Sequence, residues 1–127
     1  MAERDLDVLL RKMEPLLSST PYGIAVWRGG TLPLQPFATV AEEEGLTVVA
    51  ILADMQAAGM HSDPWARISL GIHSDLAAVG LTATFATALA AVGISANVIA
   101  GFHHDHILVQ WDRRHDALAA LQEASRG

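Results

Sequence analysis

The sequence contains no cysteine among its 127 residues, which excludes a disulfide framework and catalysis by a thiolate. It also lacks long apolar runs, because each apolar stretch is broken by Gly, Thr, Ser or His before it could span a bilayer. Basic residues are few, since 8 Lys and Arg stand against 14 Asp and Glu and leave a net charge of −6. Such a chain repels phosphate backbones and anionic lipid, so nucleic acid and membrane surfaces are poor candidate partners.

Apolar residues make up 51% of the chain, which favours a folded protein with a real core over a disordered one. A chain of this length buries roughly two-thirds of the surface that its unfolded form exposes, so it can fold alone. Its first residues, MAERDLDVLLRK, are charged and amphipathic and do not resemble a signal peptide. These features predict a cytoplasmic protein.

The first half of the chain reads as helix, strand, strand, helix. We expect these elements over residues 5–17, 22–27, 46–51 and 52–58, from apolar residues at helical spacing and from short buried runs. Pro15 is expected to end or bend the first helix, and Gly59 to end the last. Residues 28–36 hold two glycines and two prolines and predict a loop, whereas residues 38–40 are ambiguous.

The sequence His61-Ser62-Asp63-Pro64 is the best candidate for an internal boundary, and it divides the chain into units 1–61 and 62–127. The second unit reads as strand, helix, strand, strand, helix over residues 65–72, 81–92, 94–100, 106–111 and 112–124, in that order. Gly93 is expected to end the first helix and Asp112 to cap the second. Each half is short of a full βαββαβ pattern, so two incomplete units in series could complete one another's sheets.

The stretch from Trp65 to Gln122 contains three motifs: a strand and glycine loop (RISLGIHSDLAAVG), an alanine-rich helix (LTATFATALAAVGIS) and a pair of strands (ANVIAGFHHDHILV). It resembles the ACT-domain superfamily, the small ligand-sensing modules of amino-acid metabolism, and within it a branch of uncharacterised bacterial proteins with tandem ACT-like halves. The resemblance implies an α+β fold of two small ferredoxin-like βαββαβ units in tandem with antiparallel sheets. It also allows strands to be exchanged between the two halves. The last helix is followed by no strand, so a closing strand must come from elsewhere or be absent.

The loop that ends at Gly80 leads into a helix, whose first turn offers unpaired N–H groups and partial positive charge to a carboxylate. Asp75 and Ser74 are placed to meet an ammonium group. The ACT resemblance implies ligand-binding roles for a set of residues on this loop and on the second strand: Ser74, Asp75, Val79, Gly80, Leu81, Asn97, Val98 and Ile99. The alternative is that Ser74 or Asp75 only organises the loop and that Gly80 is a turn glycine.

The histidines near the C-terminal strand pair suggest a metal site. His104 and His106 would share one face of a strand, and His73 would lie near them if its strand were their neighbour. Zinc needs three or four converging ligands, whereas a polar hairpin turn needs none. Ser69 has no visible base partner in the sequence, so a serine hydrolase is poorly supported.

From these observations the sequence predicts a non-catalytic regulatory protein that binds a small molecule, with an amino acid as its ligand. The resemblance further implies a homodimer, and no cofactor is expected. Two alternatives remain open. One is a metal-binding protein or hydrolase that uses His73, His104 and His106. The other is a protein–protein docking module whose sheet serves as the docking surface.

Overall fold

The computed structural model describes residues 14–71 and 80–126. Contacts group these residues into two compact units, one formed by residues 19–65 and the other by residues 14–18 together with the described part of 66–126. The boundary after residue 61 stays a prediction. Within the described residues, no helix combines the length and apolar character that crossing a membrane requires.

The N-terminal unit consists of three strands and one short helix: β2 (Tyr22–Trp27), β3 (Ala38–Glu42), β4 (Gly45–Ile51) and α2 (Leu52–Ala57). Strand β4 lies between β3 and β2 and is antiparallel to both. Its alternate residues Val48 and Ala50 are buried against Met55 of α2, which forms the core of this unit. The loop that the sequence predicted connects β2 to β3, at the place where a βαββαβ unit would have its first helix. The segment that was ambiguous from the sequence alone belongs to β3.

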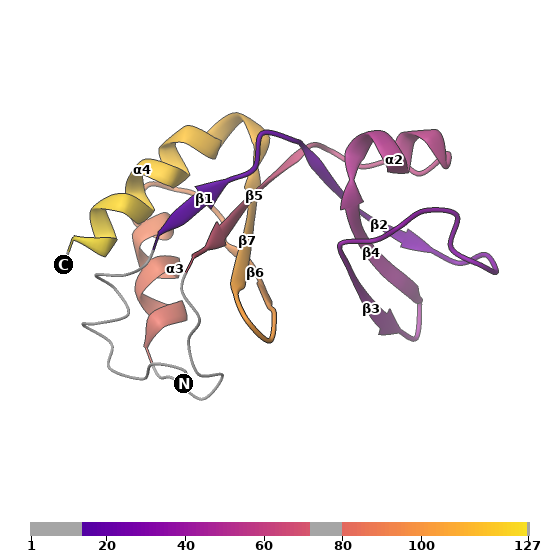
Figure 1. The fold of residues 1–127 in the computed structure, drawn as a ribbon, viewed down its shortest axis with the longest axis horizontal. Coiled ribbons are helices and arrows are strands. Elements are labelled where there is room, and N and C mark those ends of the chain that lie inside the picture. The colour runs from indigo at the N-terminus through magenta and orange to yellow at the C-terminus, as the bar shows by residue number, and fades with distance from the viewer. Residues whose placement is uncertain (1–13, 72–79, 127) are drawn as a thin grey trace. The chain divides into compact units, whose positions relative to one another are not determined.

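The C-terminal unit contains β5 (Trp65–Leu70), α3 (Leu81–Ala91), β6 (Asn97–Ala100), β7 (Asp105–Gln110), a 3-10 turn (Trp111–Arg113) and α4 (Arg114–Ser125). Helices α3 and α4 pack on one face of its sheet (Figure 1). The core lies between them and the sheet, where Ile68 and Ile107 meet Phe85 and Leu121. Every second residue of β5 faces this core, and the residues between are half-buried on the opposite face.

Strand β1 (Pro15–Leu17) supplies the closing strand of the C-terminal unit. It runs antiparallel to β5, with Leu16 opposite Ser69 and Leu17 opposite Ile68. The order β1-β5-β7-β6 completes a ferredoxin-like βαββαβ unit, which confirms the α+β fold with antiparallel pairing and strand exchange. The prediction of a helix continuing to Leu17 is wrong at 15–17, because a proline suits the first residue of an edge strand and the backbone there pairs with β5. Residues 5–13 lie outside the described ones.

Both helix-ending glycines were predicted correctly. Gly59 and Gly93 adopt left-handed φ values of +76°, which glycine accepts without a steric cost. In each case the next residue donates its N–H to the carbonyl five positions back, so that Met60 bonds Met55 and Ile94 bonds Leu89, which is a Schellman motif. Ile94 is thus buried at the helix end, and the strand predicted to begin there begins at Asn97 instead.

The predicted cap of the last helix is wrong. Asp112 lies inside the 3-10 turn, and the N-cap position belongs to Arg113, which makes no side-chain cap hydrogen bond. The reason is local, because the chain tightens into a 3-10 turn directly after β7 and the α-helix begins only at Arg114.

Candidate functional site

The predicted ligand loop ends where α3 begins. Gly80 is the N-cap residue of this helix and has a left-handed φ of +96°. Its carbonyl oxygen accepts the backbone N–H of Thr84 at 2.9 Å and the Thr84 hydroxyl at 2.8 Å. No side chain caps the helix at this position. The Leu81 side chain is 3% exposed and packs in the core, so Leu81 can meet a ligand only through its main chain.

The other predicted ligand residues divide into two groups. Ser74, Asp75 and Val79, together with His73 of the alternative metal site, lie outside the described residues. Asn97, Val98 and Ile99 form most of β6, the end strand in the order of this sheet.

The pairing register of β6 places its three candidate residues on both faces of the sheet. Val98 is opposite Ile107, a core residue on the helix-covered face, whereas Asn97 and Ile99 are opposite Leu108 and His106 on the other face. The Asn97 amide donates to the Leu108 carbonyl at 3.4 Å. A ligand that contacts all three residues must therefore lie along the strand rather than on one face.

A polar cluster on the face of the sheet away from α3 and α4 was missed by the sequence analysis. The Ser69 hydroxyl of β5 is 2.7 Å from Nδ1 of His106 on β7, and the Arg67 guanidinium donates to the same hydroxyl at 3.3 Å. All three residues are half-buried. The prediction that Ser69 lacks a base partner is wrong, because β7 is the sheet neighbour of β5 although the two residues lie 37 positions apart.

The charge state of this cluster is set by its surroundings. Burial lowers the pKa of His106, and the nearby charges of Arg67 and His104 lower it further. Burial also raises the pKa of the Asp105 carboxyl, which precedes His106 on β7. The lowered pKa favours the neutral imidazole at pH 7, and the tautomer of this ring decides whether the Ser69 hydroxyl donates to Nδ1 or accepts from it.

The lowered pKa of His106 predicts a loss of stability in acid. Below its ordinary value of 6.5, the unfolded chain takes up a proton at this residue more readily than the folded chain does. We therefore expect the free energy of unfolding to fall as the pH drops below 6.5, and the His106→Gln variant to show a weaker fall. Urea denaturation from pH 7.5 down to about 5 measures both slopes. His115→Gln, which removes an exposed imidazole of α4, should keep the wild-type slope, and equal slopes for all three proteins would contradict the prediction.

The metal alternative finds no support in the described residues. In residues 14–71 and 80–126, no three His, Cys, Asp or Glu side chains gather as they would around a metal ion. His104 lies in the turn before β7, where its carbonyl accepts the Gly101 N–H, and His106 is engaged with Ser69.

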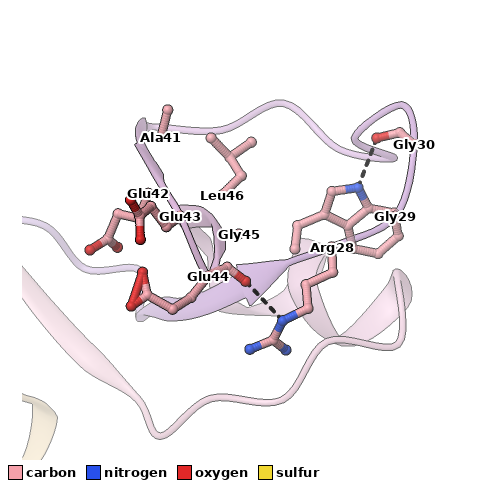
Figure 2. A pocket seen from close by; sticks show the side chains of 10 residues that line it. Arg28, Gly29, Gly30, Ala41, Glu42, Glu43, Glu44, Gly45 and Leu46 are labelled. Carbon is pink, nitrogen blue, oxygen red and sulfur yellow. Dashed lines mark hydrogen bonds between the residues drawn. The ribbon is translucent and has the colours of Figure 1, made fainter.

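The N-terminal unit contains an open pocket of about 530 Å³, shown in Figure 2. Its walls are the loop after β2 and the β3–β4 turn, with lining residues Trp27, Arg28, Gly29, Gly30, Ala41, Glu42, Glu43, Glu44, Gly45 and Leu46. The Trp27 indole N–H donates to the Gly30 carbonyl at 3.0 Å, and Arg28 Nε donates to the Glu44 carbonyl at 2.9 Å. Both side-chain donors are therefore engaged by main-chain carbonyls of the pocket's own walls. The three glutamates are exposed, as expected of a solvated charge run.

Comparison with protein families gives two matches in tandem. Family models described as ACT domain match residues 60–123 and residues 1–67. Among curated proteins no match is found.

Solved structures of similar fold include a protein of unknown function from Vibrio cholerae, described as a possible transport protein. It is 47% identical, with a TM-score of 0.85 over 94% of this chain and 95% of that one. A protein from Agrobacterium tumefaciens is 20% identical, with a TM-score of 0.70 over 84% of each chain. The regulatory subunit of aspartate kinase from Thermus thermophilus is 12% identical, with a TM-score of 0.61 over 87% of this chain and 95% of that one. The last two likenesses show the fold alone.

Proposed function

Because the chain belongs to the ACT-domain family, we propose that it is a non-catalytic regulatory protein that binds a free amino acid. The observation that carries this proposal is the pair of ACT domain matches in tandem, which together span residues 1–123. The fold is also that of a regulatory subunit of aspartate kinase, which supports a regulatory role for a ligand-binding module. We propose further that the protein is a cytoplasmic homodimer.

The proposed ligand site lies at the start of α3. An amino-acid carboxylate would accept hydrogen bonds from the first N–H groups of the helix, where the macrodipole adds partial positive charge. Gly80 has no Cβ, so the carboxylate can approach the backbone closely, and Leu81 would contribute its N–H. The ammonium group would bind Asp75 and Ser74. The remaining residues of the proposed site are Val79, Asn97, Val98 and Ile99.

This proposal predicts that at least one free amino acid raises the melting temperature. A ligand that binds only the folded form stabilises it by about 2.7 kcal/mol at a concentration one hundred times its dissociation constant. A thermal-shift screen of the common amino acids at millimolar concentrations measures the effect. In Gly80→Ala the added Cβ would hinder the close approach of the proposed carboxylate to the backbone, so the shift should disappear.

The matched control is Gly93→Ala at the other end of α3. Gly93 has a similar left-handed φ, and a Cβ built there meets nothing within 4 Å, so this variant carries comparable backbone strain without touching the proposed site. It should keep the full shift. The proposal fails if no amino acid shifts the melting temperature, or if Gly80→Ala responds as the wild type does.

A further inference from the structure

Strand β3 is the end strand of the sheet in the N-terminal unit (Figure 1). Within residues 14–71 and 80–126, β4 is the one strand that pairs with it, and residues 39–42 are exposed. We propose that the open edge of β3 pairs with the same edge of a second copy of the chain, antiparallel and centred on Val40. This inference rests on the homodimer proposed above, and it names the strand that forms the interface.

Strand β3 lacks the features by which proteins usually keep an end strand from pairing, which are proline, lysine, a bulge or an inward-pointing charge. It reads Ala-Thr-Val-Ala-Glu, and its register with β4 is one to one over all five residues. Its one charged side chain, Glu42, accepts the Thr47 hydroxyl of β4 and therefore leans toward its own sheet. The outward N–H and C=O groups of β3 are thus open to another strand.

The sequence of β3 suits antiparallel pairing with itself. With Val40 at the two-fold axis, each Val40 lies opposite its counterpart, and each Glu42 lies opposite Ala38 of the other copy. A β-branched pair at the centre is favourable, and the two carboxylates lie at opposite ends of the paired strands. Parallel pairing in register would instead place Glu42 beside Glu42, with Glu43 and Glu44 directly after it, and like charges placed opposite each other destabilise a sheet. The strand is therefore complementary to itself, as a two-fold interface requires.

The pairing also covers exposed apolar surface. The register places Val40, Thr47 and Val26 side by side across β3, β4 and β2. Val40 is 55% exposed and Val26 is 40% exposed, although both side chains are apolar. In the dimer this row continues from one Val40 to the other, so the two side chains shield each other from water. That burial adds a hydrophobic contribution to the backbone hydrogen bonds of the new strand pair.

Disulfide mapping in the full-length protein tests the pairing directly, because the chain has no cysteine of its own. Val40→Cys should form a covalent dimer on mild oxidation, since residues directly opposite in an antiparallel pair are close enough for a disulfide. Ala38→Cys should not, because the two copies of residue 38 would lie four positions apart along the strands, about 13 Å. Val98→Cys, at an exposed position of β6, measures crosslinking by random collision. Absence of the Val40→Cys dimer, or equal crosslinking of all three variants, would overturn the proposal.

A charge at the axis gives a second, independent test. Val40→Lys places two ammonium groups opposite each other, so the dissociation constant of the dimer should rise by about tenfold or more in analytical ultracentrifugation. Circular dichroism should show an intact fold, because the Val40 side chain is exposed, and Val98→Lys should dimerise as the wild type does. An unchanged Val40→Lys dimer would overturn the β3 interface while keeping the homodimer, whereas a monomeric wild type would remove both. Amino-acid binding is tested separately, since Val40→Lys should keep the amino-acid thermal shift.

Discussion

Replacing Phe85 with alanine should lower the free energy of unfolding by about 3–5 kcal/mol. Phe85 is fully buried in the middle of α3, within the core cluster that joins this helix to β5, β7 and α4. Truncation removes the transfer free energy of the ring and leaves a cavity that strands on one side and a helix on the other cannot readily fill. Urea denaturation followed by circular dichroism measures the loss.

Phe102→Ala is the matched control, because the Phe102 side chain in the β6–β7 turn is 71% exposed. This variant removes the same atoms from a position that contributes little to the core, so its stability should change by less than about 0.5 kcal/mol. Similar losses for the two variants would mean that Phe85 does not pack in the core described here.

Replacing Leu17 with aspartate should lower the free energy of unfolding by about 2–3 kcal/mol. Leu17 is the last residue of β1, and its side chain packs against the core of the C-terminal unit. The substitution loses that apolar contact and places a carboxylate beside apolar neighbours, where it is poorly solvated. The same denaturation experiment measures this effect, and it tests whether β1 completes the C-terminal sheet in solution.

Leu16→Asp provides the comparison within the same strand. Leu16 points to the other face of β1 and is 62% exposed, so an aspartate there remains in water and should change stability by less than about 0.5 kcal/mol. If the two variants were equally stable, β1 would not hold the position opposite β5 that the pairing register gives it.

The sequence predicted those parts of the fold that depend on neighbouring residues. Gly59 and Gly93 were identified as helix ends because a left-handed residue after a helix is a local requirement. The helical pattern before Leu17 is equally local, yet residues 15–17 form a strand because β5 supplies hydrogen-bond partners from a distant part of the chain. Propensity is a weak guide wherever such non-local pairing decides the backbone conformation.

The candidate sites show the same difference between features set by neighbouring residues and features set by distant ones. The start of α3 at Leu81 was predicted from a glycine followed by helical spacing, and the structure places Gly80 at the cap. The contact between Ser69 and His106 could not be predicted in that way, since it requires knowing that β5 and β7 are sheet neighbours. A signal was present in the alternation of polar residues along β5, where Arg67 and Ser69 fall on the same face.

The position of β1 makes the N-terminal unit an insertion within the other unit, since residues 19–65 are nested between the two segments that build the C-terminal fold. During synthesis β1 emerges from the ribosome before any other described strand, and its pairing partner β5 follows only after the whole inserted unit. Strand β1 can therefore pair with β5 only after the whole inserted unit has been synthesised, so the sheet of the C-terminal unit joins residues from both sides of that unit.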